Sequence, residues 1–468
     1  MLKSPSVHAR GSQIIRRSST ISSGKTCKAR RSGQSASKSS LSTAFEGAIV
    51  NLFKSYYGTT NDVDEPTVVI CTEDMIDKLS YVCDPKVIFV GKMPLTSEVV
   101  EQAIFRNCPI DDTTVNALIG CSVEYKTLTV LRLEFCNLSA EHVSTIANNL
   151  HNTRISDLSL NGNTADKEQN FFLLLEKLRL KNLSLKYCSI NSEGMSMIAD
   201  KLSKPSGTLL VLNLASNMLY DEGAEHAARM LRSNRTLLSL NLADNKITDK
   251  GCKYIMQSLV EFELLPDEVY FKRKRNYEKL KSVLNANLNP SEEVLPGEQI
   301  AAKKSPPKNM IKEKSSGSLA RRGSSKSKDK SAASVASQTS SSQNAMLDPS
   351  YHPFINDITE DHQTILCKGN DVVINLNLSY NSIHKEGANV IVDTLKQQQC
   401  FFPTNRGLLR VTTDGNSFHA YCPSEVNEIE EILLQKARKM RGSINSVRSG
   451  SGQKKSGSKV SLLPSIKT

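Results

Sequence analysis

Residue types that carry catalytic chemistry are scattered along this chain of 468 residues, without the spacing of an active site. No histidine belongs to an H-E-x-x-H motif or stands beside a cysteine at metal-ligand spacing. The chain also lacks the phosphate-binding G-x-x-x-x-G-K-[ST] loop and the G-x-S-x-G turn of serine hydrolases. We therefore expect no catalysis, no cofactor and no metal. The isolated histidines considered are His142, His151, His226, His384 and His419.

The cysteine count, the charge and the hydropathy of the chain predict its cellular compartment and the kinds of partner it has. Eleven cysteines, an odd number without C-x-x-C spacing, predict reduced thiols and a cytoplasmic location. Lys and Arg number 60 against 48 Asp and Glu, and residues 1–45 contain no acidic residue. No apolar run reaches the length of a membrane span, so we expect no membrane partner.

A basic run, Lys272, Arg273, Lys274 and Arg275, has three interpretations. It is a solvated helix face, a nuclear-import signal, or a docking patch for a polyanion such as nucleic acid or the acidic tails of tubulin. Nucleic acid is the less favoured partner, because the basic residues lack the interleaved aromatic residues on which single strands stack.

Two serines follow paired arginines and match what basophilic kinases accept. They are Ser19, after Arg16-Arg17, and Ser324, after Arg321-Arg322. A phosphate adds about −1.5 to −2 charge and would weaken a contact with an acidic partner. The motif is short, so an unused site remains the alternative interpretation.

The elements that position any site come from a repeat. The pattern L-x-x-L-x-L-x-x-N/C-x-L recurs every 25 to 29 residues and is clearest in LLVLNLASNML (209–219), LLSLNLADNKI (237–247) and VINLNLSYNSI (373–383). Each copy predicts a short strand, and an apolar helical stretch follows it. Such a period predicts an α/β leucine-rich-repeat solenoid, a horseshoe with a parallel sheet inside and helices outside. The first six copies start at Val100, Leu128, Ile155, Leu180, Leu209 and Leu237.

The N/C position of the pattern lies where the chain turns away from the strand. The N/C slot holds Asn217, Asn245, Asn381 and Asn416, whose amides we expect to bond backbone groups left unpaired at the turn. Cysteines that fill this slot, such as Cys136 and Cys188, are expected to be structural thiols.

Outward strand positions predict a concave surface for a protein partner. One column is Ile104, Arg132, Ser159, Ser184, Asn213, Asn241, Asn377 and Thr412, and the next is Arg106, Glu134, Asn161, Lys186, Ala215, Ala243, Ser379 and Asp414. Because arginine and aromatic residues dominate interfaces, the candidate surface is Arg106, Arg132, Glu134, Phe135, Lys186, Tyr187, Asn213 and Asn241. The alternative is that these are simply solvated sheet positions.

The repeats are interrupted once. After Leu237 the next strand is due near residue 265, yet the next clear copy begins at Val373, so we expect residues 373–378 to pair in parallel with 237–242. The predicted parts are a disordered basic tail (1–45), a capping region (46–99), repeats (100–262), a largely disordered basic insertion (263–370), repeats with a cap (371–435) and a second disordered basic tail (436–468).

This order of parts resembles ribonuclease-inhibitor-type leucine-rich repeat proteins whose array is interrupted by a basic linker. The resemblance implies a non-enzymatic scaffold for protein partners, cytoplasmic and associated with motile cilia or the axoneme, with no cofactor. Microtubule-associated or other acidic surfaces are the partners to test first. One alternative is a nuclear or nucleic-acid-associated adaptor that uses the basic segments. A weaker alternative is a regulator of small GTPases. It is weaker because such regulators typically carry an acidic tail, whereas the tails of this chain are basic.

Overall fold

The computed structural model describes residues 40–57, 66–78, 85–91, 99–164, 168–203, 207–288, 351–360, 364–403 and 405–449. The predicted disorder of residues 1–39, 289–350 and 450–468 therefore concerns segments outside the described residues, as do Ser19 and Ser324.

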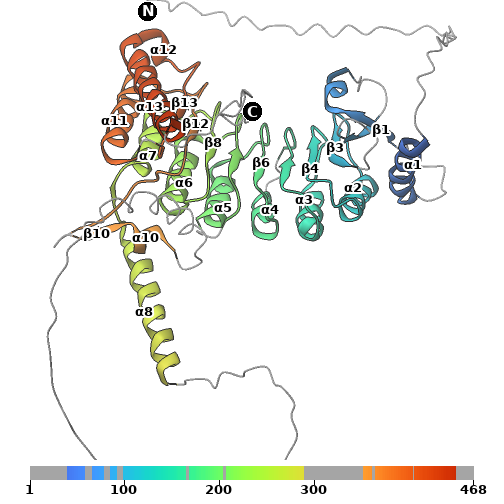
Figure 1. Cartoon of the computed structure of the whole chain (residues 1–468), viewed down its shortest axis with the longest axis horizontal. Helices are drawn as coiled ribbons and strands as arrows, with labels where there is room; N and C mark the ends of the chain where they lie inside the picture. The colour runs from blue at the N-terminus through green and yellow to red at the C-terminus, as the bar shows by residue number, and fades with distance from the viewer. Residues whose placement is uncertain are drawn as a thin grey trace, which may run out of the picture.

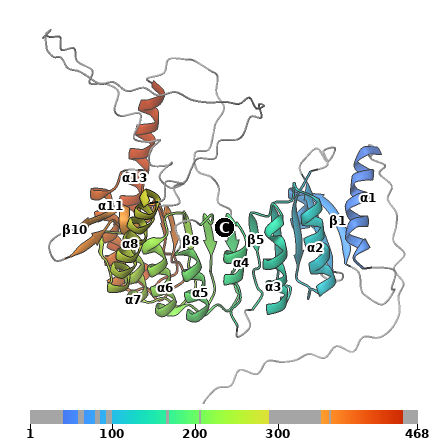
Figure 2. The same ribbon diagram turned by 90° about the horizontal axis from the view of Figure 1, so that it is seen from below.

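One ten-stranded sheet runs the length of the solenoid, with a row of helices along one side of it (Figures 1 and 2). Neighbouring strands are parallel except for the antiparallel pair β2 and β3. The mixed α/β layering agrees with the predicted class of fold. In spatial order the strands are β1 (Thr67–Thr72), β2 (Lys86–Gly91), β3 (Val100–Arg106), β4 (Val130–Glu134), β5 (Asp157–Ser159), β6 (Asn182–Ser184), β7 (Val211–Asn213), β8 (Ser239–Asn241), β12 (Asn375–Asn377) and β13 (Arg410–Thr412).

The helix that begins at Asp249 is held at its start by the preceding repeat. The Asp221 carboxylate accepts hydrogen bonds from the backbone N–H groups of Thr248 (2.8 Å) and Gly251 (3.0 Å) at the start of the next helix. A Cβ at Gly251 would lie 2.5 Å from that carboxylate oxygen, so glycine permits this close approach. The helices are α1 (Ser40–Ser55), α2 (Asp112–Glu124), α3 (Ala140–Asn149), η2 (Leu150–Asn152), α4 (Phe172–Lys177), α5 (Ser192–Leu202), α6 (Tyr220–Ser233), α7 (Asp249–Ser258), α11 (Lys385–Phe401), α12 (Phe418–Tyr421) and α13 (Pro423–Ser449).

A continuous apolar core lies between the sheet and the helices. The inward leucines of the repeats, such as Leu212 and Leu240, are fully buried in it. The core is not divided at the insertion, because Leu376 and Leu378 belong to the same cluster. Stacking therefore buries apolar surface that one repeat alone would expose. Among the described helices, none is long and apolar enough to span a bilayer.

Asparagines at the N/C slot join consecutive repeats, as predicted. Asn217 Oδ1 accepts from the backbone N–H groups of Cys188 and Ile190, both at 3.0 Å, and its Nδ2 donates to the carbonyls of Leu185 and Leu214, both at 2.9 Å. Asn381 makes the same four kinds of contact, and Asn416 makes three of them. Asn245 donates to the carbonyls of Leu214 and Ala243, but its Oδ1 has no hydrogen-bond partner among the described residues. The side chain thus satisfies turn groups that water does not reach.

Cysteine replaces asparagine at this slot in three repeats, at Cys108, Cys136 and Cys188. The Cys136 thiol donates to the Phe105 carbonyl at 3.2 Å, and the Cys188 thiol donates to the Leu160 carbonyl at 3.3 Å. Burial raises the pKa of Cys188 to about 12, so its thiol stays protonated and unreactive. The Cys136 and Cys188 thiols are free and buried, and their hydrogen bonds to backbone carbonyls fit the predicted structural role.

The stack resumes directly after the insertion. Strand β12 pairs in parallel with β8, with Leu376 opposite Leu240, which confirms the predicted pairing. The insertion leaves and re-enters through a small antiparallel sheet of β9 (Phe262–Glu263), β11 (Ile365–Cys367) and β10 (Ile358–Glu360). This sheet and its helices α8 (Pro266–Leu288) and α10 (Pro353–Asn356) are called the clamp below.

The clamp orders both ends of the predicted insertion 263–370. Phe262, Leu264, Phe354 and Cys367 form a small apolar core of their own, so these ends bury enough surface to fold. Their apolar residues are spread over two short segments about a hundred positions apart, too far for periodicity to connect them.

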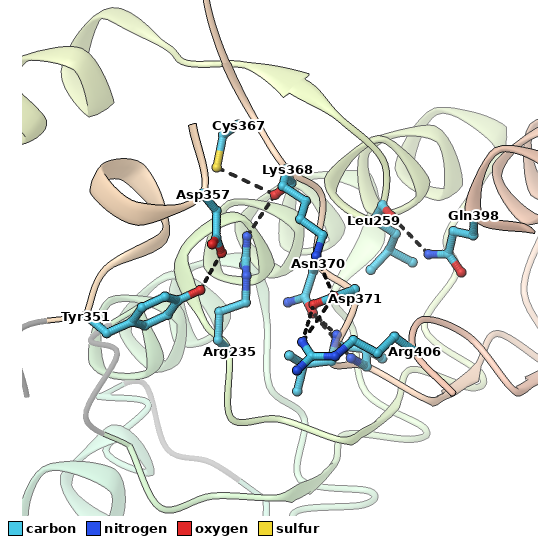
Figure 3. Close-up of polar contacts among 12 residues, drawn as sticks. Arg235, Leu259, Tyr351, Asp357, Cys367, Lys368, Asn370, Asp371, Gln398 and Arg406 are labelled. Carbon is cyan, nitrogen blue, oxygen red and sulfur yellow. Dashed lines mark hydrogen bonds and ion pairs between the residues drawn. The ribbon is translucent and has the colours of Figure 1, made fainter. Parts of the chain in front are cut away.

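A buried polar cluster attaches the clamp to the solenoid (Figure 3). The Arg235 guanidinium is almost fully buried and donates to the carbonyls of Leu231 and Lys368, both at 3.0 Å. Asp371 accepts from Lys368 (2.8 Å) and Arg406 (3.1 Å). Burial by itself raises the pKa of Asp371, but the hydrogen bonds and charges of these two cations outweigh it and lower the pKa.

At the C-terminal end, α13 continues to Ser449, past the predicted boundary at residue 435. Ile429 and Ile432 on this helix are buried in the main core. Lys436 is also buried and donates to the Leu408 carbonyl at 3.0 Å. Residues 436–449 were predicted to be disordered because they are basic, but they continue a helix that is apolar on one face.

The N-terminal end corrects one predicted site position. Ile104 was expected on the open concave face, but it is buried in a second small core with Cys71, Ile76 and Ile88. Strands β1 and β2 and the short helix η1 (Glu73–Lys78) belong to this end of the sheet. The apolar side chain of Ile104 at an outward strand position could have predicted that another segment covers it.

Candidate partner-binding surface

The pairing register places the predicted outward columns side by side. Arg132 lies opposite Ser159, Ser159 opposite Ser184, and Asn213 opposite Asn241. The same column continues across the insertion to Asn377 and Thr412. The alignment of the columns is therefore confirmed, but five of their members are buried rather than open on the surface: Ile104, Asn213, Ala215, Ala243 and Ser379.

Several predicted surface residues are held by neighbours on the sheet. Glu134 accepts hydrogen bonds from Ser159 Oγ (2.6 Å) and Asn161 Nδ2 (3.2 Å), and Arg106 lies opposite it on β3. Asn213 and Asn241 accept from the backbone N–H groups two residues later, at 3.2 Å and 3.1 Å. These asparagines therefore help to form the turn at the end of their own strand.

A single slot just beyond each strand adopts positive φ in every repeat. In three repeats an aromatic residue occupies it: Phe135 (φ 56°), Tyr187 (φ 55°) and Tyr380 (φ 57°). Their rings are 51%, 53% and 67% exposed. The left-handed region is unfavourable by roughly 1–2 kcal/mol for residues with a Cβ. Elsewhere the slot holds Asn107, Gly162, Ser216, Asp244 and Gly415.

Backbone hydrogen bonds between repeats hold this conformation. The N–H of Phe135 donates to the Asn161 carbonyl at 2.8 Å, and the N–H of Tyr380 donates to the Asp414 carbonyl at 2.7 Å. The solenoid thus fixes the backbone at each slot, while the side chain points away from the core.

Two of the exposed rings lie near each other across one repeat. The centroids of Phe135 and Tyr187 are 6.4 Å apart, with Gly162 in the repeat between them. A Cβ at Gly162 would lie 2.2 Å from Phe135 Cδ1, so the ring covers the glycine. Phe135, Tyr187 and Tyr380 are called the aromatic edge below.

A shallow hollow of about 510 Å³ lies between Tyr187 and Tyr380. Its floor is made of small residues, Ala215, Ser216 and Ala243, with Lys186 and Asp244 beside them. Of the predicted surface, the structure brings Lys186, Tyr187 and Asn241 into this hollow. Tyr380 and Asp244 were not predicted, although both occupy the same slot after the strand as Phe135 and Tyr187.

The basic run 272–275 lies on α8, away from this hollow, and a helix spreads its four residues around the axis. Lys272 pairs with Glu360 of β10, and Arg275 lies close enough to His352 to lower its pKa. Arg273 and Lys274 are exposed.

Within the described part of the chain, no group of three or more His, Cys, Asp or Glu residues is arranged to hold a metal ion. His142 contacts Asp112 and caps α3, and His419 hydrogen-bonds to Thr413. Both have structural partners.

Comparison with known families gives one match. A family model described as Leucine Rich repeat matches residues 233–256, which contain β8 and most of α7. The match supports a leucine-rich repeat in this part of the chain. A comparison with curated proteins finds none that matches it. Repeats of this family typically form non-enzymatic interaction domains that bind protein partners.

Proposed function

We propose that this leucine-rich repeat protein is a non-enzymatic scaffold that binds a protein partner across the aromatic edge and the hollow beside it. The observation that carries the proposal is the exposure of Phe135, Tyr187 and Tyr380 at strained backbone positions. Exposed aromatic rings on a rigid support are common anchors of protein interfaces.

The fold itself does not require aromatic residues at these positions. Five other repeats place Asn107, Gly162, Ser216, Asp244 and Gly415 in the same conformation. Residues of this kind tolerate the left-handed region better than a large ring does. Strain that packing does not demand is typical of sites that bind a ligand.

We further propose that the scaffold acts in motile cilia or the axoneme. The order of its parts supports this, because it resembles that of leucine-rich repeat-containing protein 71: a divergent first repeat, five successive copies, EFELLPDEVYFKRKR (261–275), a basic linker, VINLNLSYNSI and a degenerate last copy, LLRVTTDGNSF. A cytoplasmic location fits the free thiols. The partner is a microtubule-associated protein or another acidic surface.

Proximity labelling in ciliated cells tests both parts of the proposal. The test variant is Phe135→Asn/Tyr187→Asn/Tyr380→Asn, because asparagine tolerates positive φ while removing the ring. Tyr421→Asn is the matched control, since Tyr421 is an exposed aromatic residue that does not line the hollow.

Wild-type and control proteins should label the same axonemal proteins, and the triple variant should lose most of them. Equal labelling by all three would contradict the role of the aromatic edge. Enrichment of chromatin proteins without axonemal ones would instead favour the nuclear adaptor.

A further inference from the structure

Helix α8 is fixed firmly at its base. Arg232 of α6 donates two hydrogen bonds of 2.6 Å to the Glu268 carboxylate, and its guanidinium lies 3.8 Å from the ring centroid of Phe262. Phe271 packs against His352 with a centroid distance of 4.6 Å. These contacts hold the first two turns against α6 and against His352 at the start of α10. Beyond them the helix projects away from the solenoid (Figure 1).

An apolar stripe runs along α8 from its second turn outward, and no described residue buries it. Four large side chains on it are between 61% and 68% exposed. Their spacing of seven, three and four residues places them within an arc of about 80° on one side of the helix. They are Tyr270, Tyr277, Leu280 and Leu284.

The stripe does not contribute to the stability of this chain by packing. From Asn276 onward every residue with a described side chain is exposed, so tertiary contacts do not support that part of the helix. A helix of this length is marginal in water without such contacts. A partner that buries the stripe would therefore also stabilise the helix.

The net positive charge of α8 favours an acidic partner for the stripe. Residues 270–288 contain six basic residues and one acidic residue, Glu278. A second copy of α8 would bring like charges together, which disfavours self-association. An occupant with carboxylates around an apolar floor complements both features.

The positions of the basic residues around α8 favour a protein groove over a membrane surface as the partner. Arg273 lies within the arc of the stripe and Lys274 and Lys281 border it, whereas Lys279 lies about half a turn away, on the far side of the helix. A helix lying on a bilayer directs its far side to water, so Lys279 would not reach the headgroups. A groove that encloses the helix contacts both sides.

We propose that α8 is a docking helix that inserts Tyr270, Tyr277, Leu280 and Leu284 into the apolar groove of an acidic protein. This interaction is independent of the aromatic edge, which lies on the solenoid.

The test measures binding of the full chain to Ca²⁺-loaded calmodulin, used as a soluble protein with an apolar groove and an acidic rim. The variant is Leu280→Glu/Leu284→Glu, which places two charges in the stripe. The control is Asn276→Glu/Ser282→Glu, which adds the same charge at exposed positions outside the stripe. Leucine and glutamate are both good helix formers, and far-UV circular dichroism checks that both proteins keep their helix content.

We expect saturable binding that the stripe variant weakens by at least about tenfold, while the control weakens it much less. Absence of binding at roughly 100 µM would overturn the proposal. Equal weakening by both variants would also overturn it, because charge alone would then explain the contact. Binding to vesicles of phosphatidylcholine and phosphatidylserine, without binding to calmodulin, would assign the helix to a lipid surface instead.

Discussion

Replacement of Asn217 by alanine should destabilise the solenoid more than its small loss of volume suggests. The Asn217 side chain is buried and bonds the backbone of two repeats through four contacts of 2.9–3.0 Å. Alanine would leave the N–H groups of Cys188 and Ile190 without an acceptor, and the carbonyls of Leu185 and Leu214 without this donor.

The magnitude follows from these groups. A buried polar group that loses its partner costs about 1–3 kcal/mol, with donors at the upper end. Two donors and two partly compensated carbonyls give an expected loss of roughly 3–5 kcal/mol in the free energy of unfolding.

Asn213 in the same repeat supplies the matched control. Its side chain accepts one hydrogen bond, from the Ala215 N–H at 3.2 Å. Asn213→Ala should therefore lose no more than about 1.5 kcal/mol. Urea unfolding followed by circular dichroism compares the two variants, and hydrogen exchange reports on the amides of Cys188 and Ile190. If Asn217→Ala were no less stable than Asn213→Ala, with both amides still protected, the inferred role of the asparagines would be wrong.

Four further outcomes are expected. Leu240→Asp should unfold the array, because it places an unpaired charge at a fully buried position; an unchanged melting curve would refute the assigned core. Gly162→Ala should cost about 1 kcal/mol from positive φ, plus displacement of Phe135, and a double-mutant cycle with Phe135→Ala should recover the second part. Burial and the nearby Arg275 and Arg235 lower the pKa of His352 from 6.5 to about 4, so the folded state binds fewer protons between these values and clamp stability falls as pH drops through this window; hydrogen exchange in β9–β11 should accelerate near about pH 5, less so in His352→Gln. Microtubule co-sedimentation should be weaker for Ser19→Glu/Ser324→Glu than for the wild type, since added negative charge opposes an acidic partner; equal sedimentation would argue against tethering by the basic segments.

The repeat pattern predicts most of the solenoid because each slot has one physical task. Inward leucines and the turn asparagines recur at fixed positions, so they specify strands, register and the return of β12 to β8. The same register locates the outward columns. Periodicity is informative here because every repeat contacts only its neighbours.

Features that depend on contacts between distant segments were not predictable in this way. The cover over Ile104 and the clamp around Phe262 and Cys367 join segments without a shared period. Tyr380 was not predicted because the choice rested on the charged and aromatic residues of the N-terminal repeats and not on the slot that Phe135, Tyr187 and Tyr380 share.

The pairing of β8 with β12 also affects how the protein folds and how it can change. Leu240 and Leu376 are adjacent in the sheet but 136 residues apart, whereas neighbouring repeats are separated by about 28. Chain closure over this longer span costs only about 1.4 kcal/mol more, because the entropy grows with the logarithm of length. The last two repeats should consequently join the array late in folding, with little loss of final stability. Doubling the intervening segment would add only about 0.6 kcal/mol, so its length and composition are nearly free to diverge among related chains while the horseshoe stays the same.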